Sequence, residues 1–280
     1  MKLLRLGEKG EEKPAALDKN GKLRDISSLI KDLNPEFLNF ETISKLEGLD
    51  LSSLPELPAG KRIGSCITKP GKFVAIGLNY SDHAAETGAD APSEPIVFMK
   101  ATSSINGPND DIEIVSGSKK LDWEVELGIV IGKETKHISQ DQAQDHILGY
   151  CLVNDISERE WQIEKMGQWV KGKSHDTYGP IGPHLVTKDE IADINNLKMS
   201  LEVNGKRMQT GNTSTMIFNV DFIVSYLSKF MSLQAGDIIT TGTPPGVGMG
   251  MKPQQFLKKG DTMKLSIENL GEQNSKVVAL

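Results

Sequence analysis

The 280-residue sequence predicts a β-rich protein of the α+β class. Eight apolar segments have the length and β-branched composition of strands. Few of them are separated by a helical pattern, which favours antiparallel or mixed sheets over a doubly wound parallel sheet. In chain order the segments are KFVAIGLNY, PIVFMKA, DIEIV, DWEVELGIVIG, ILGYCLVND, LKMSLEVNG, GDIITTG and TMKLSIENL. Helical patterns are predicted in SQDQAQDHI, ISEREWQIEKM and FNVDFIVSYLSKFM.

The first 70 residues predict a separate small domain. PAALDKNGKLRDIS has an apolar run, Asn20-Gly21 and a second apolar run, a pattern typical of a hairpin with a tight turn. Helical pieces are expected over 26–49. Residues 51–72 are then rich in proline and glycine, which indicates a connection. We therefore predict a small domain at 1–70 and a main domain at 71–280.

Composition and charge narrow the class of protein. The net charge is −6 and the sequence pI is near 5.5, which argues against nucleic acid or an anionic membrane as a partner. No apolar run approaches the roughly 18 residues that span a bilayer, and the start MKLLRLGEKGEEK lacks a secretory pattern. The only two cysteines, Cys66 and Cys151, lie in apolar contexts and are expected to be buried free thiols. A cytoplasmic location is predicted.

The stretch GQWVKGKS, from Gly167 to Ser174, matches the phosphate-binding pattern G-x-x-x-x-G-K-[ST]. Such a loop joins a strand to a helix, so that helix amides meet the phosphates. Here the preceding residues are helical in pattern, and the following HDTYGPIGP cannot continue a helix. The match is therefore predicted to be coincidental, and Lys173 needs another explanation.

Three acidic residues form a candidate metal site. In LDWEVELGIVIG, Glu124 and Glu126 point to one face of a strand, although a solvated strand face is the commoner reading of this pattern. Asp155 ends the apolar strand ILGYCLVND, and Ser157 with Glu160 has the spacing of a capping box that opens a helix. Three carboxylates favour a hard divalent ion such as Mg²⁺, Mn²⁺ or Ca²⁺ over zinc.

Two weaker patterns complete the list of candidates. In GLNYSDHAAE, His83 and Glu86 share one face of a helical turn, where a carboxylate can raise the basicity of an imidazole. An ordinary surface pair is the alternative. The loop TTGTPPGVGMG offers Thr243 and open glycine amides to an anion, but a plain turn explains it equally well.

GLNYSDHAAE, LDWEVELGIVIGK, VNDISEREWQ, KGKSHDTYGPIGP and TTGTPPGVG occur together in this order, and the chain thereby resembles the fumarylacetoacetate hydrolase family. The resemblance covers 72 to about 250. It implies a mixed β-sandwich roll with a small N-terminal α/β domain, assembled as a homodimer. It also implies one Mg²⁺ or Mn²⁺ per active site and a small-molecule 2-oxo acid as substrate.

The resemblance assigns roles by position. It implies that Glu124, Glu126 and Asp155 are metal ligands and that His83, Glu86 and Lys173 are catalytic. Gln162 and Thr243 match substrate-contacting positions. Asn79 stands near the place of a fourth carboxylate ligand found in the animal enzyme of tyrosine catabolism, so water or substrate oxygens are expected to complete the coordination.

The implied reaction is hydrolysis of a carbon–carbon bond in an acylpyruvate or 2,4-diketo acid, through a pyruvate enolate that the metal stabilises. The same kind of site supports isomerisation or decarboxylation of 2-oxo or 2-hydroxymuconate-type diacids. Ureidoglycolate lyase is a third alternative, because bacterial members with a similar N-terminal segment carry that name. Binding without catalysis is expected to coincide with loss of a candidate residue, and none is missing.

Overall fold

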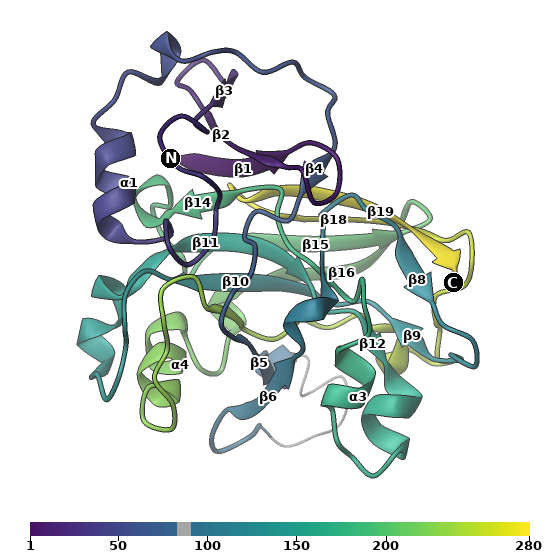
Figure 1. The fold of residues 1–280 in the computed structure, drawn as a ribbon. Helices are drawn as coiled ribbons and strands as arrows, with labels where there is room; N and C mark the ends of the chain where they lie inside the picture. The colour runs from purple at the N-terminus through teal and green to yellow at the C-terminus, as the bar shows by residue number, and fades with distance from the viewer. Residues whose placement is uncertain (83–90) are drawn as a thin grey trace.

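The computed structural model describes residues 1–82 and 91–280, and it confirms a β-rich α+β fold (Figure 1). A large sheet has the strand order β3-β2-β1-β14-β11-β10-β17-β5-β6, with β4 pairing β1, and a five-stranded sheet has the order β16-β15-β18-β19-β8. Two short strand pairs, β12-β9 and β13-β7, form separate two-stranded sheets. Pairing is mainly antiparallel, with parallel contacts at β17-β5, β13-β7 and β19-β8.

The bounds of the elements follow from these pairings. The large sheet contains β1 (Lys2–Leu6), β2 (Lys13–Leu17), β3 (Leu23–Asp25), β4 (Ile63–Gly64), β5 (Phe73–Gly77), β6 (Ile96–Lys100), β10 (Val125–Ile131), β11 (Ile147–Asn154), β14 (Leu185–Thr187) and β17 (Ile238–Thr240). The second sheet contains β8 (Ile112–Ile114), β15 (Lys198–Val203), β16 (Lys206–Asn212), β18 (Thr262–Ile267) and β19 (Gly271–Ala279). The short pairs are β7 (Ile105–Asn106), β9 (Leu121–Asp122), β12 (Ser157–Glu158) and β13 (Gly179–Pro180). The α-helices within the described residues are α1 (Phe40–Glu47), α3 (Val170–Lys173) and α4 (Val220–Leu227).

The predicted N-terminal hairpin is confirmed as β2 and β3. Leu17 pairs with Leu23 across a turn in which Gly21 has a φ of +74°, a conformation that glycine adopts without steric cost. The Asp18 carboxylate accepts hydrogen bonds from the Asn20 and Lys22 amides, which fixes the turn.

Strands β10 and β11 are buried on both faces, so their sequences are apolar without a clean alternation. One apolar cluster, which includes Leu127 and Leu152, packs between this sheet and the second sheet. The other cluster, which includes Val153 and Leu148, is closed by residues of the first 70 positions. The central strands are therefore held rigidly from both sides.

The N-terminal segment extends the large sheet of the main part. Lys2 pairs with Val186, so β1 lies beside β14. Cys66 and Cys151 both belong to the second apolar cluster and are free and buried, as predicted. Leu3 and Ile26 pack in that same cluster with residues of the central strands. The division into 1–70 and 71–280 stays a prediction, but the segment contributes both a strand and half of a core.

One of the three helix predictions needs correction at its start, and another is confirmed as a 3-10 helix. The capping box at Ser157 is wrong: Ser157 pairs with Asp122 in β12, and its hydroxyl donates to the Asp155 carbonyl. A π-helical turn begins only at Glu160 and ends at Glu164. SQDQAQDHI forms a 3-10 helix over Gln140–Asp145. The third prediction is confirmed as α4, whose first turn is capped by the Asn219 side chain.

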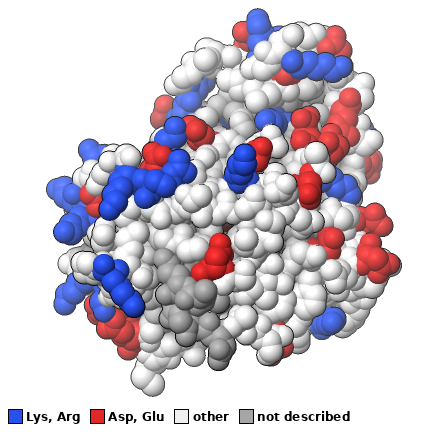
Figure 2. Space-filling view, turned by 180° about the vertical axis from the view of Figure 1, so that it is seen from behind, with Lys and Arg blue, Asp and Glu red and all other residues white. Residues whose placement is uncertain are grey.

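Within the described residues, no helix is both long and apolar enough to cross a membrane. Charged side chains of both signs lie in small neighbouring groups on the face that Figure 2 shows.

Deleting residues 1–70 is expected to abolish cooperative folding of the remainder. The deletion leaves β14 with an unpaired edge and exposes the apolar face that includes Leu185 and Val153. Urea denaturation followed by circular dichroism measures the transition. A sharp two-state transition with the stability of the full chain would contradict this prediction.

Candidate metal centre and adjoining cavity

The candidate site is built where β10 and β11 run side by side. Val125 pairs with Asn154, and the Asp155 amide donates to the Glu124 carbonyl at 3.0 Å. This register places Asp155 directly opposite Glu124, at the end of the strand pair. Glu126 follows on β10, and its carboxylate accepts a hydrogen bond from the Gly242 amide at 3.0 Å.

The structure brings the three predicted carboxylates together. One oxygen each of Glu124, Glu126 and Asp155 lies within 4.8 Å of the others. The three residues are 6%, 1% and 0% exposed, so the solvated strand face considered as an alternative is wrong. A compact, buried set of three carboxylates is suited to a hard divalent cation.

Lys173 belongs to this cluster. Its Nζ donates to Glu124 Oε2 and to Asp155 Oδ2, each at 2.7 Å. Burial lowers the pKa of Lys173, but the charges of Asp155 and Glu124 outweigh it, so the pKa is raised. Val170–Lys173 is a helical turn that follows the turn Glu160–Glu164, and not a strand-to-helix loop. The phosphate-loop pattern is therefore coincidental, as predicted.

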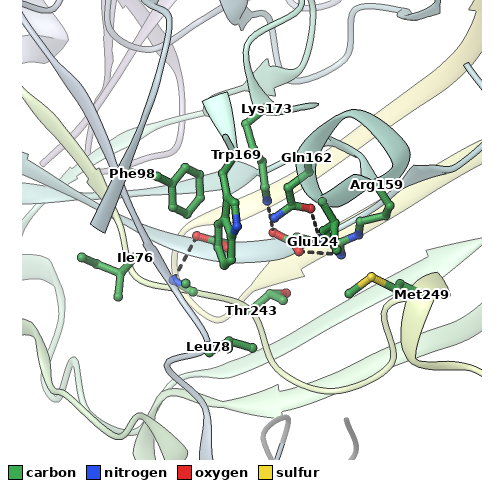
Figure 3. Close-up of a pocket in the computed structure, with 14 residues that line it drawn as sticks. Ile76, Leu78, Phe98, Glu124, Arg159, Gln162, Trp169, Lys173, Thr243 and Met249 are labelled. Atoms are coloured by element: carbon green, nitrogen blue, oxygen red, sulfur yellow. Dashed lines mark hydrogen bonds and ion pairs between the residues drawn. The ribbon is translucent and has the colours of Figure 1, made fainter. Parts of the chain in front are cut away.

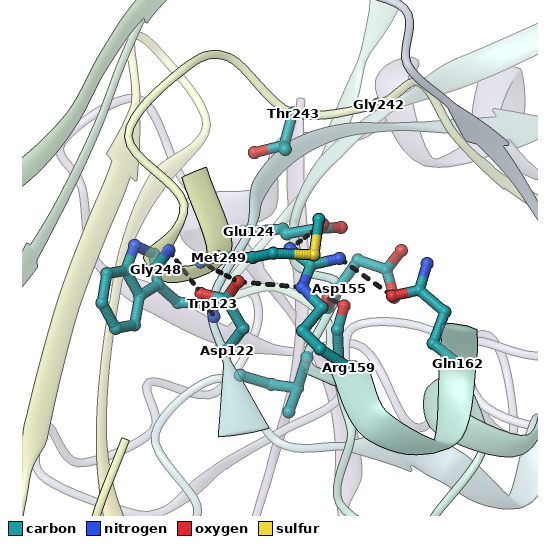
Figure 4. A network of polar contacts seen from close by, with 12 residues as sticks. Asp122, Trp123, Glu124, Asp155, Arg159, Gln162, Gly242, Thr243, Gly248 and Met249 are labelled. Atoms are coloured by element: carbon teal, nitrogen blue, oxygen red, sulfur yellow. Dashed lines mark hydrogen bonds and ion pairs between the residues drawn. The ribbon is translucent and has the colours of Figure 1, made fainter. Parts of the chain in front are cut away.

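Arg159 and Asp122 form a second layer that the sequence analysis did not single out (Figure 4). Arg159 donates to Glu124 Oε1 at 2.6 Å, to Asp122 Oδ2 at 2.8 Å and to Gln162 Oε1 at 3.0 Å. Asp122 also accepts from the Gly248 and Met249 amides. The glycine-rich loop thus donates amides to a carboxylate of the protein itself.

The three candidate ligands differ in whether nearby cationic side chains balance their charge. Burial raises the pKa of Glu124, but Lys173 and Arg159 more than offset it and bring the pKa to about 2. Burial and the charges of Asp155 and Glu124 raise the pKa of Glu126 well above its usual range. Among the residues that the structure describes, Glu126 has no ion-pair partner. A divalent cation beside Glu126 would relieve this excess of negative charge, so the residues fit a metal.

Lys100, at the end of β6, is a further residue that sequence reasoning missed. Its Nζ lies 2.5 Å from Asp155 Oδ1 and also donates to the carbonyls of Ile156 and Lys173. Lys100 is 1% exposed, and burial lowers its pKa against the attraction of Asp155. The one available signal was a lysine ending the apolar run PIVFMK.

A cavity of about 230 Å³ opens beside the cluster (Figure 3). Glu124, Glu126 and Lys173 line one part of it, together with the predicted substrate-contacting residues Gln162 and Thr243. The Thr243 hydroxyl donates to the Val125 carbonyl and accepts from Gln209, so it also supports the strand β10.

Three other residues singled out by the resemblance lie outside this cluster or outside the described residues. The Asn79 amide donates to the Phe218 and Thr241 carbonyls and accepts from the Phe218 amide, and completion of the metal coordination by water or substrate oxygens stays a prediction. His83 and Glu86 lie outside the described residues. Their pairing on one helical face and their catalytic roles therefore stay predictions.

A buried acidic centre thus lies at the end of the β10–β11 pair, beside a cavity, in a β-rich α+β fold. The sequence model for "Fumarylacetoacetate (FAA) hydrolase C-terminal" matches residues 72–278. The chain therefore belongs to the fumarylacetoacetate hydrolase family of enzymes.

The chain is similar to proteins from several bacteria. A protein of Burkholderia ambifaria is 57% identical over 274 residues, which cover 98% of this chain and 97% of that protein. Its name gives hydrolase as the activity and specifies no substrate. The fumarylacetoacetate hydrolase of Exiguobacterium antarcticum is 34% identical with a TM-score of 0.90 and full coverage of both chains.

Two other solved structures differ in reaction. The 2-hydroxyhepta-2,4-diene-1,7-dioate isomerase of Mycobacterium marinum is 32% identical with a TM-score of 0.74, covering 100% of this chain and 98% of that one. The maleylpyruvate hydrolase of Sphingobium sp. SYK-6, solved with manganese(II) and pyruvate, is 26% identical with a TM-score of 0.83, covering 100% and 99%. The family thus includes hydrolases and isomerases with this fold.

Replacing Lys100 by methionine is expected to lower the free energy of unfolding by about 3 kcal/mol. The change breaks a buried ion pair with Asp155 and removes the hydrogen-bond donor of the Lys173 carbonyl. Urea denaturation in EDTA measures the loss. Lys45→Met is the matched control, since Lys45 pairs with Glu41 on the exposed face of α1 and should leave stability unchanged. Equal stability of the two variants would contradict the structural role of Lys100.

Proposed function

We propose that the protein is a metal-dependent hydrolase that cleaves a carbon–carbon bond of an acylpyruvate or another 2,4-dioxo acid. The observation that carries this proposal is the buried set of Glu124, Glu126 and Asp155 with the Lys173 ammonium between two of them, next to an open cavity. Membership of a family with hydrolases of such compounds supports it.

Glu124, Glu126 and Asp155 would hold one Mg²⁺ or Mn²⁺. Their oxygen donors are of the kind that both ions prefer, and a related hydrolase has been solved with manganese(II) and pyruvate. When bound, the ion supplies Lewis-acid polarisation of the substrate's oxygens.

The protein's own residues would orient the substrate. Lys173 keeps its ammonium charged between two carboxylates, so it can offset negative charge that develops on a substrate oxygen. Gln162 uses its Oε1 to accept from Arg159, which leaves its Nε2 group to donate to the substrate. Thr243, which also lines the cavity, would be a further contact for the substrate.

The proposed step consumes one water. His83, oriented by Glu86, would take a proton from that water as its oxygen adds to the carbonyl at C4. The C3–C4 bond then breaks, and its electron pair goes to the pyruvate half as an enolate, which takes up a proton at C3. The products are a carboxylic acid and pyruvate, so atoms and charges balance.

Isomerisation of a 2-hydroxymuconate-type diacid is the second candidate, favoured by the similarity to the Mycobacterium marinum isomerase. It needs proton transfer between carbons but no added water. Incorporation of ¹⁸O from labelled water into the product acid separates hydrolysis from isomerisation. Decarboxylation and ureidoglycolate cleavage, the homodimer and the cytoplasmic location stay predictions from the resemblance and the composition.

Lys173→Met is expected to lower kcat by roughly 10²–10³ while the fold is retained, because it removes an electrostatic donor from the reacting site. The assay follows loss of the dioxo-acid absorbance with Mg²⁺ or Mn²⁺, and EDTA should abolish the wild-type rate. Lys171→Met is the control, since Lys171 lies in the same helix but is exposed and donates to the Lys165 carbonyl. A Lys173→Met rate within tenfold of wild type would contradict the proposed role.

A further inference from the structure

The cavity has two unlike walls (Figure 3). The acidic cluster, Arg159, Gln162 and Lys173 form one wall. The other is apolar and consists of Ile76, Leu78, Phe98 and Trp169. Ile163 and Met249 also line the cavity, but Ile163 follows Gln162 in the chain and the Met249 amide donates to Asp122. A substrate whose 2-oxo acid end faces the acidic cluster therefore places its other end against apolar side chains.

The cations of the polar wall are already engaged. Lys173 pairs with Glu124 and Asp155, and Arg159 pairs with Asp122 and Glu124. Among the described residues that line the cavity, these two are the only cationic side chains. Among the described lining residues, a second carboxylate on the substrate would therefore meet no cation beyond these two, whose charges are already shared with protein carboxylates, so its loss of water would be poorly compensated.

The apolar wall is held in place by close packing. A Cβ atom at Gly77 would lie 2.5 Å from the Trp169 ring, so the glycine is needed for this ring position. The Trp169 and Phe98 rings lie 5.1 Å apart between centroids and are tilted by 59°. Lys173 Nζ lies 5.2 Å from the Phe98 centroid, which joins the aromatic wall to the acidic cluster.

The volume of the cavity limits the size of the acyl group that it can hold. An apolar cavity of about 150 Å³ is large enough to bind benzene. The present cavity of about 230 Å³ must also take the 2-oxo acid end, so its apolar part suits one ring or a short chain.

We propose that the acyl group of the substrate is apolar, a single aromatic ring or a short alkyl chain, and that Trp169 determines this specificity. The inference rests on the proposed hydrolysis of acylpyruvates. It excludes diacids and polyhydroxylated 2,4-dioxo acids as the preferred substrates.

The wild-type test compares kcat/KM for benzoylpyruvate, hexanoylpyruvate, fumarylpyruvate and a polyhydroxylated 2,4-dioxo acid, each with Mg²⁺ and Mn²⁺. The first two are expected to exceed the others by at least about tenfold, the usual effect of one well-placed apolar contact. A preference for the diacid or the polyol overturns the inference but leaves the proposed function. Absence of turnover with all four compounds would instead refute the proposed function.

Binding without turnover gives a second readout. Phenylpyruvate and 2-oxoglutarate are 2-oxo acids without a 4-oxo group, so the proposed cleavage cannot act on them. With Mg²⁺ present, quenching of tryptophan fluorescence should show phenylpyruvate binding at least about tenfold more tightly. Equal or tighter binding of 2-oxoglutarate would overturn the inference.

Variants of Trp169 test the residue itself. Trp169→Ala should raise KM for benzoylpyruvate roughly tenfold or more and leave KM for acetylpyruvate nearly unchanged, because acetylpyruvate lacks the large group. Trp169→Phe should retain most of the wild-type preference for benzoylpyruvate over acetylpyruvate. This variant replaces the alanine variant in the test if the latter does not fold. Trp161→Ala is the control, since Trp161 packs on Lys165 and does not line the cavity. Equal changes in KM for both substrates would contradict a role in specificity.

Discussion

The site depends on how the protein accommodates four buried carboxylates, Asp122, Glu124, Glu126 and Asp155, in one cluster. Isolated carboxylates are costly to bury, so each needs a cation or hydrogen-bond donors. Lys100, Lys173 and Arg159 supply three positive charges and pair with three of the four groups. Glu126 accepts from the Gly242 amide but has no ion-pair partner among the described residues, and burial together with the charges of Asp155 and Glu124 raises its pKa.

This arrangement connects the fold to the chemistry. The β10–β11 pairing fixes Glu124 and Asp155 opposite each other, and the helical turns of Arg159 and Lys173 and the loop of Gly242 close around them. Both faces of the strand pair are covered by apolar clusters, so the carboxylates have little freedom to move apart. The surrounding core therefore holds like charges at short separations, a geometry that favours a divalent cation.

The sequence was informative where the chemistry is local. The strands carrying Glu124, Glu126 and Asp155 are apolar, so acidic residues stand out among their neighbours in the chain. Lys100 and Arg159 were missed because their partners are 55 and 35 positions away, and no local pattern encodes such contacts. The capping box failed at Ser157 because tertiary pairing with Asp122 outweighed a local capping preference. The contact of Phe98 with Trp169 depends on packing between β6 and the residue that precedes α3, which periodicity does not reveal.

The most direct test of the central claim is a Mn²⁺ titration of the chelator-treated protein, followed by electron paramagnetic resonance of the free ion. The account predicts one tightly bound Mn²⁺ per chain, and loss of that binding in Glu126→Gln, which removes the carboxylate that lacks an ion-pair partner among the described residues. Unfolding curves of the variant in EDTA would establish that it remains folded. Saturable binding of one ion by a folded Glu126→Gln variant with wild-type affinity, or no binding by the wild type, would contradict the account.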